Sequence, residues 1–136
     1  MPFFVVSMSN RFTKAERICS KREVDELFRT GKFSSQGILK FRMLEVDSSD
    51  WPKAKFLVIV PKRSVKKAVD RNKVKRRLRE VIRLNKNEMV QQYQSHSNKR
   101  VLLAVLYMGQ GIPQYHLLEK SFKDWIEKQW PQINKN

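Results

Sequence analysis

The residues of this chain best suited to chemistry are the cations of one short segment, residues 62–83. This segment holds eleven of the chain's 29 Lys and Arg residues but only two of its 13 acidic residues, Asp70 and Glu80. Closely spaced cations repel one another on a bare surface, and the planar donors of arginine match the oxygens of a phosphate in pairs. The segment therefore predicts contact with a polyanion.

From Asp70 onward the same segment has the spacing of an amphipathic helix. One stripe, at positions i, i+4, i+7 and i+8, consists of Val74, Leu78, Val81 and Ile82. The opposite face consists of Asn72, Arg76, Arg79 and Arg83, flanked by Lys73 and Lys75. A solvated helix face usually mixes signs to form i, i+4 pairs, whereas here only Glu80 is available to pair. The pattern favours a helix that packs its apolar face into the core and binds an anion with its basic face.

Composition sets the outer limits. The chain has 136 residues, 40% of them hydrophobic, which suits one domain with its own core. The net charge is +16 and the pI is near 10.3, so the candidate partners are nucleic acid, an anionic membrane or an acidic protein. The single cysteine, Cys19, cannot form an internal disulfide, which favours a reducing cytoplasm.

The N-terminal residues MPFFVVSM lack the basic region and the long apolar run of a signal peptide, and no run reaches the ~20 apolar residues of a membrane span. We therefore expect neither export nor a membrane partner, and Met8 is an alternative start to Met1. We expect a disordered extension over residues 1–9, one α+β domain over 10–131 and a tail over 132–136.

The remaining elements follow from caps and periodicity. Ser20 and Glu23 form a capping box, and Gly31 is a stop signal for a helix over Lys21–Thr30. Further along the chain we expect strands over Ile38–Val46, Lys55–Val60 and Val101–Tyr107, a last helix over Gln114–Trp130, and an additional short strand over Phe33–Gln36. The first of these strands places Leu39, Phe41 and Met43 on one side and Lys40 and Arg42 on the other. The order α-β-β-(β)-α-β-α predicts a single-domain α/β sandwich of the α+β class.

A search for an autonomous active site finds no suitable constellation. The carboxylates lie on a surface helix or in turns, and neither His96 nor His116 has a Cys or His neighbour at metal-ligand spacing. No glycine-rich phosphate loop is present, and no serine has an adjacent base. The sequence therefore predicts no catalytic residue, no metal site and no small-molecule substrate for the protein itself.

One family resemblance rests on the basic helix. The run Arg71-Asn72-Lys73-Val74-Lys75-Arg76, followed by Leu78-Arg79-Glu80, closely resembles the Arg-Asn-Arg signature of the bacterial ribonuclease P protein component. Lys62-Arg63 lies upstream at the family's spacing, an opening with Arg11-Phe12-Thr13-Lys14 and Arg17-Ile18 precedes the first helix, and the order of elements agrees from about residue 10 to 130.

The resemblance implies a function and a mechanism. In that family the small protein joins a catalytic RNA to remove 5′ leaders from precursor tRNA in the cytoplasm. Mg²⁺ bound mainly by the RNA activates water, while the protein screens the repulsion between the two RNAs. The family also implies that the strand-helix-strand crossover containing the signature helix is left-handed, against the usual rule.

The resemblance also implies two sets of site residues. For contact with the catalytic RNA we expect Lys62, Arg63, Lys67, Arg71, Asn72, Lys73, Lys75, Arg76, Arg79 and Arg83. Asn72 could equally act as a local capping or bridging residue. In the family, apolar or aromatic residues of the first helix form one wall of a groove for the single-stranded leader. Phe28 matches the second aromatic position of that wall, and Val24 takes the place of the first. We hypothesise that Val24, Phe28, Phe41 and Arg42 form the groove, and a plain core role for Val24 and Phe28 is the alternative.

Two other functions remain open at this stage. A ribosomal or RNA-chaperone protein that binds structured RNA without catalysis fits the charge equally well, and only the signature argues against it. A protein-only nuclease fits poorly, because it needs the carboxylate or histidine constellation that the sequence lacks.

Overall fold

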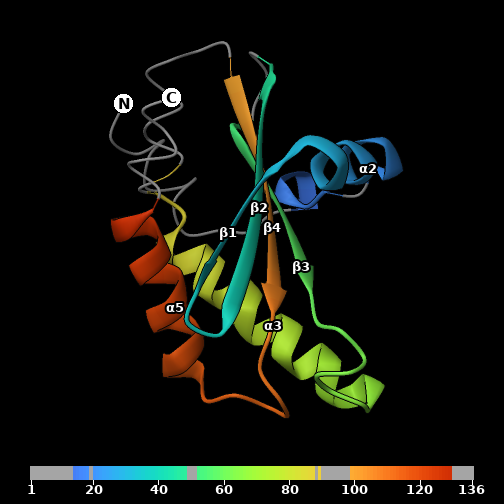
Figure 1. The fold of residues 1–136 in the computed structure, drawn as a ribbon, viewed down its shortest axis with the longest axis vertical. Coiled ribbons are helices and arrows are strands. Elements are labelled where there is room, and N and C mark those ends of the chain that lie inside the picture. Colours follow the sequence, from blue (N-terminus) through green and yellow to red (C-terminus); the bar gives the residue numbers. More distant parts are fainter. Residues whose placement is uncertain (1–13, 19, 49–51, 88, 90–98, 130–136) are drawn as a thin grey trace.

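The computed structural model describes residues 14–18, 20–48, 52–87, 89 and 99–129 (Figure 1). A short 3-10 helix, η1 (Lys14–Glu16), precedes α2 (Lys21–Thr30). The remaining elements, in chain order, are β1 (Lys32–Gln36), β2 (Leu39–Asp47), β3 (Ala54–Ile59), α3 (Ala68–Asn85), β4 (Lys99–Tyr107) and α5 (Tyr115–Lys128). The predicted α+β fold is confirmed, including the additional short strand.

The strands form one sheet in the order β1-β2-β4-β3. β1 and β2 are antiparallel and meet at Gly37, whose φ of 58° is one that glycine adopts readily. β4 is antiparallel to β2 and parallel to β3. Because α3 connects the neighbouring parallel strands β3 and β4, it is the helix of the expected crossover. The left-handedness of that crossover stays a prediction.

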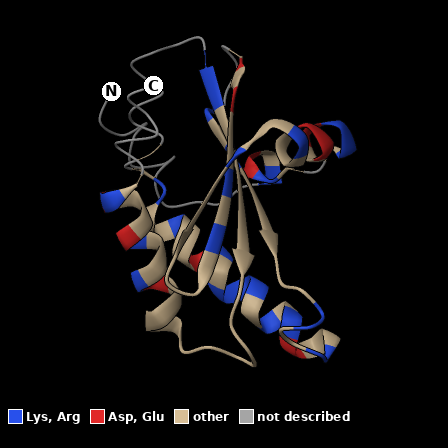
Figure 2. Ribbon diagram, viewed as in Figure 1, with Lys and Arg blue, Asp and Glu red and all other residues tan. Residues whose placement is uncertain are grey.

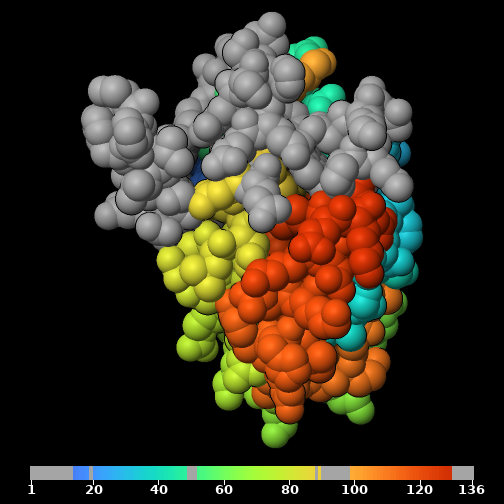
Figure 3. All heavy atoms as spheres, turned by 90° about the vertical axis from the view of Figure 1, so that its left-hand side faces the viewer, coloured from blue at the N-terminus to red at the C-terminus, as the bar shows by residue number. Residues whose placement is uncertain are grey.

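Helices cover both faces of the sheet. Val101, Leu103 and Val105 of β4 pack in the larger core with α3 and α5, while Leu102 and Ala104 pack with Leu27 of α2. Successive residues of a strand point to opposite faces, so α2 lies on one face and α3 with α5 on the other. Figure 3 shows α5 and α3 side by side over their face.

The local signals placed several boundaries correctly. α2 begins and ends where expected: Ser20 Oγ accepts a hydrogen bond from the Glu23 N–H at 3.4 Å, and the Gly31 N–H donates to the Leu27 carbonyl. Trp125 is a core residue, as expected, and its Nε1 donates to Ser34 Oγ at 2.8 Å. The predictions for residues 1–9, Cys19, His96, Trp130 and residues 132–136 lie outside the described residues.

The segment before α2 is fixed against the outer edge of the sheet. Arg17 forms an isolated parallel bridge with Phe56 of β3, and the Ile18 N–H donates to the Phe56 carbonyl at 2.9 Å. Glu16 forms a buried ion pair with Lys86, which directly follows α3. This segment therefore covers the free edge of β3 and connects it to the C-terminal end of α3.

No helix of the described part is long and apolar enough to cross a membrane.

Candidate nucleic-acid interface

α3 presents the two faces that its sequence predicts. The four residues of the apolar stripe, Val74, Leu78, Val81 and Ile82, are all fully buried. On the other side Asn72, Lys73 and Arg76 are exposed, and Lys75, Arg79 and Arg83 are partly exposed. Figure 2 shows these cations running along the helix and into the loop at its N-terminal end. One helix thus anchors the core and offers a row of cations to solvent.

The loop before α3 extends this cationic surface. Lys62, Arg63 and Lys67 are exposed there, as a nucleic-acid contact requires. A backbone hydrogen bond connects this loop to the segment before α5, because the Gly111 N–H donates to the Ser64 carbonyl at 2.9 Å. The backbone that carries these cations is therefore held in place.

Two arginines of α3 have structural roles that the sequence did not reveal. Arg71 Nη1 donates to the carbonyls of Val65, at 3.0 Å, and Lys66, at 2.7 Å, and so fastens the loop to the helix. Arg77 Nη1 donates to the Pro113 carbonyl at 2.8 Å and holds the loop that leads into α5. The acceptors are backbone carbonyls of other segments, so residue types alone gave no signal.

Charges near the C-terminal half of α3 differ in their surroundings. Arg83 pairs with Glu80 at 2.5 Å, which raises the pKa of Arg83 and lowers that of Glu80. Burial lowers the pKa of Arg79, and the positive charge of Arg17 lowers it further. Arg17 therefore adds to the positive potential beside α3. It was not among the expected contact residues, although it belongs to the opening that carried part of the resemblance.

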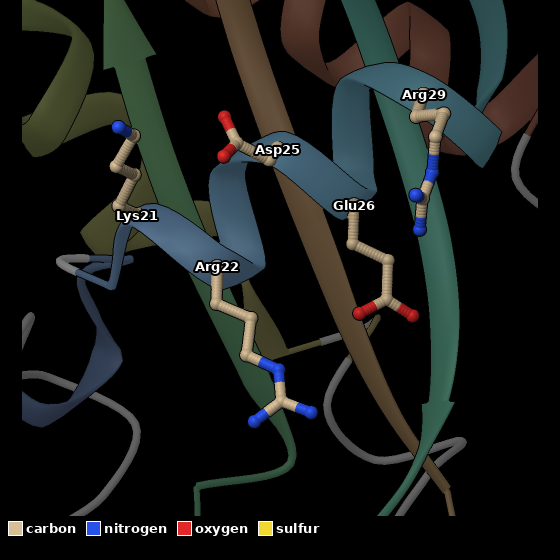
Figure 4. A pocket seen from close by; sticks show the side chains of 5 residues that line it. All are labelled: Lys21, Arg22, Asp25, Glu26 and Arg29. Atoms are coloured by element: carbon tan, nitrogen blue, oxygen red, sulfur yellow. The ribbon is translucent and has the colours of Figure 1, made fainter.

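The outer face of α2 provides a contrast. Lys21, Arg22, Asp25, Glu26 and Arg29 line a shallow hollow there, and Figure 4 shows both signs of charge along the one helix. A mixed face is solvated and nearly neutral in sum. The large excess of cations on the α3 face is therefore a property of that face and not of every helix in this basic protein.

A second candidate surface lies between α2 and the sheet. Phe28 of α2 is 39% exposed, and the Cζ atom of Arg42, on β2, lies 5.6 Å from the centre of its ring. The Arg42 side chain is held in place, because its Nη1 donates to the Phe28 carbonyl at 3.0 Å. Val24 is half-buried against the smaller core. Of the expected groove residues, Phe28 and Arg42 are thus brought together at the surface, whereas Val24 packs against the smaller core.

The prediction that Phe41 lines the groove is wrong. Phe41 is only 1% exposed and its ring stacks on that of Trp125, with ring centres 4.3 Å apart. Residues 41 and 42 are neighbours on one strand and must point to opposite faces of the sheet. Arg42 therefore lies on the α2 face and Phe41 in the core below α3 and α5.

The described residues contain no group of three or more His, Cys, Asp or Glu side chains that could hold a metal ion. Several acids are engaged in ion pairs with lysine or arginine, namely Glu16, Glu23, Asp47, Glu80 and Asp124. His116 is exposed at the start of α5. The arrangement of the described charged residues is suited to binding an anion.

Together, the fold and the cationic helix define a basic α+β protein of the nucleic-acid-binding class. A family model described as Ribonuclease P matches residues 12–128. The chain belongs to the ribonuclease P family, as the sequence predicted, and is a ribonuclease P protein subunit with a role in tRNA processing and an RNA partner.

Comparison with one solved structure agrees on the fold. A structure of the Staphylococcus aureus RNase P protein is 17% identical and covers 84% of this chain and 94% of its own, with a TM-score of 0.58. A second structure of the RNase P protein from Staphylococcus aureus is 17% identical and covers 90% of this chain and 92% of its own, with a TM-score of 0.46. A search among curated proteins gave no match.

Replacing Arg76 and Arg79 by Ala should weaken RNA binding without unfolding the protein. Arg76 is exposed and Arg79 is partly exposed, and surface substitutions typically change stability by no more than about 0.5 kcal/mol. If each arginine neutralises one phosphate, the slope of log K against log salt should flatten by roughly 0.7 to 0.9 per arginine removed. Thermal melting and RNA titrations at several salt concentrations would measure both effects.

The matched control for this prediction is Arg22→Ala with Arg29→Ala, which removes the same charge from the mixed face of α2 and should leave the salt slope unchanged. Leu78→Ala should do the reverse of the α3 change and cost about 2 to 5 kcal/mol of stability as a buried truncation. Equal slopes for the two double arginine variants would show that α3 is not the RNA-binding face.

Proposed function

We propose that α3 and the loop before it bind the catalytic RNA of ribonuclease P, and that the surface between α2 and β2 binds the 5′ leader of precursor tRNA. The observation that carries the proposal is the division of α3 into a fully buried apolar stripe and an opposite face on which cations predominate. A surface of this kind gains most from a partner whose phosphates are closely and regularly spaced.

The two surfaces suit different parts of an RNA. The α3 face offers exposed cations and Asn72, which can donate to or accept from a phosphate or a 2′-hydroxyl. The α2 surface offers an exposed aromatic ring beside a fixed guanidinium, which suits an unpaired base next to its phosphate. α3 therefore takes the structured RNA, and the α2 surface takes the single strand.

In this proposal the protein contributes electrostatics and positioning, and the RNA carries out phosphodiester hydrolysis with Mg²⁺ held mainly by its own phosphates. The described side chains do not form a set that fits a resident Mg²⁺ ion, because no three or more His, Cys, Asp or Glu side chains among them are grouped together, and Glu80 of α3 pairs with Arg83. By screening two polyanions, the cations of α3 lower the free-energy cost of bringing catalytic RNA and substrate together. We place this activity in the cytoplasm.

The experiment that tests the proposal compares two substrates. Adding the protein to its catalytic RNA should raise the affinity for leader-bearing precursor tRNA more than the affinity for mature tRNA, since only the precursor has a strand for the α2 surface. Equal gains in affinity for both substrates would show that the protein does not bind the leader. No binding to the catalytic RNA, with binding to other structured RNAs retained, would favour a ribosomal or RNA-chaperone role.

Phe28→Ala should weaken precursor binding by about 5- to 150-fold and leave mature tRNA binding nearly unchanged, because a base that stacks on an exposed ring contributes roughly 1 to 3 kcal/mol. Titrations of both substrates with the assembled complex would measure this difference. Leu117→Ala, another exposed apolar truncation, on α5, is the control and should change neither affinity. Equal losses for the two substrates after Phe28→Ala would make Phe28 a structural residue only.

A further inference from the structure

The most exposed aromatic side chain in the described part of the chain is Phe33 on β1. It is 55% exposed, although it lies in a strand of the sheet. Its neighbour Ser34 faces the core and accepts the hydrogen bond from Trp125, so Phe33 must point to the opposite face, where α2 lies. An apolar ring left on this face is not explained by packing.

Two cations of β2 surround this ring. Phe33 is directly paired with Arg42 in the sheet, and the Arg42 Cζ atom lies 5.7 Å from the centre of the ring. Lys40 Nζ lies 5.0 Å from the same centre. Since Arg42 Cζ also lies 5.6 Å from the Phe28 ring, one guanidinium separates two exposed rings.

The orientation of Arg42 leaves part of its guanidinium available. Its Nη1 is engaged by the carbonyls of Phe28, at 3.0 Å, and Gly31, at 3.5 Å. Within the described residues, no acceptor is bonded to its Nε or Nη2. These two nitrogens are the pair with which a guanidinium binds two oxygens of one phosphate.

A dinucleotide of a single-stranded RNA has one base on each side of a phosphate. In the same order, this cluster has one ring on each side of a guanidinium. A structural role alone accounts poorly for it, because an exposed cation–π contact contributes only about 0.5 to 1 kcal/mol while the rings keep apolar surface in water. A single-stranded nucleic acid would cover both rings and neutralise both cations.

We propose that Phe33 and Lys40 extend the leader-binding surface from α2 to the edge of the sheet. One unpaired base of the leader stacks on Phe28 and the next stacks on Phe33. Arg42 binds the phosphate between them, and Lys40 neutralises the phosphate beyond Phe33. The inference rests on the proposed function, and it names Phe33 as a residue that sets how many leader nucleotides the protein holds.

The test uses the complete protein assembled with its catalytic RNA and a set of precursor tRNAs in which single leader nucleotides lack a base. Phe33→Ala should weaken binding of the intact precursor by about 5- to 150-fold and leave binding of mature tRNA unaffected. One abasic position should weaken wild-type binding and abolish the effect of Phe33→Ala. The adjacent abasic position should do the same for Phe28→Ala.

Three variants separate stacking from other roles. Phe33→Tyr keeps the aromatic ring and should bind as wild type does, whereas Phe33→Leu keeps apolar bulk and should bind as Phe33→Ala does. Lys40→Ala should reduce the salt slope for the precursor only. A thermal melt of each variant reports whether it folds, and the tyrosine and leucine variants keep the comparison valid if truncation to alanine destabilises β1.

The outcomes distinguish this inference from the proposed function. If Phe28→Ala separates precursor from mature tRNA and Phe33→Ala does not, the extension to Phe33 is wrong and the leader function stands. If neither variant separates the two substrates, the leader function itself is wrong. A Phe33→Ala effect that persists at every abasic position would show that the ring acts on the fold and not on a base.

Discussion

Cleavage of precursor tRNA should occur only when this protein, its catalytic RNA and Mg²⁺ are combined, and the purified protein alone should give none. The described residues contain no group of three or more His, Cys, Asp or Glu side chains that could hold a metal ion, and Glu80, beside the basic surface, pairs with Arg83. Enzymatic rate enhancements are at least about 10⁶-fold, so the complete and incomplete mixtures should differ by orders of magnitude. The measurement is the release of the 5′ leader from an end-labelled precursor.

Two controls make this result decisive. The protein is treated with a nuclease that is then removed, so that no carried-over RNA contributes. The Arg76→Ala, Arg79→Ala double variant should need a higher protein concentration for half-maximal cleavage but should keep the same requirement for RNA and Mg²⁺. Robust cleavage by the nuclease-treated protein would show that the chain is a nuclease in its own right.

The parts of the fold that were predictable are those with local causes. The helix over residues 21–30 has a capping residue and a glycine stop in its own sequence, and α3 has an apolar stripe that any core must bury. β1 was hardly predictable, because KFSSQ lacks an alternating pattern. Its pairing with β2 and the hydrogen bonds that Gln129 and Trp125 donate to it come from residues far away in the sequence.

The candidate site divides in the same way. The basic face of α3 could be predicted because helical periodicity alone places Arg76 opposite Leu78. The second role of Arg71 could not, since it depends on where the chain folds its loop carbonyls. The same limit applies to Phe33, which acquires its two cationic neighbours only through the register of β1 with β2.

The error at Phe41 has another origin. The alternation of β2 already placed Phe41 with Leu39 and Met43, which are core residues, and Arg42 on the other side. The groove hypothesis took the strand as a unit and did not separate its two faces. A pleated strand contributes to a surface only through every second side chain, so Lys40 was the better candidate beside Arg42.

The largest expected loss of stability follows from Glu16→Ala, which leaves Lys86 buried without its carboxylate partner. Both side chains are almost completely buried, and burial lowers the pKa of Lys86 while Glu16 opposes that shift. Removing one member of a buried pair typically costs about 3 to 5 kcal/mol, a large part of the roughly 5 to 15 kcal/mol that stabilises a domain. Chemical denaturation of the variant and of the wild type would measure the change.

Two further variants identify the cause of that loss. Glu80→Ala removes an exposed pair from the same helix and should cost at most about 1 kcal/mol. Glu16→Leu with Lys86→Met removes both buried charges at similar volume and should recover most of the stability lost in Glu16→Ala, because neither charge of the pair remains in the interior. Glu16 also lies in the segment that places Arg17 near Arg79, so RNA titrations of the double variant test whether the RNA-binding face needs the ion pair itself. If the double variant is stable but binds RNA more weakly, the ion pair is needed to orient Arg17. If it recovers both stability and RNA binding, apolar packing at these two positions is sufficient.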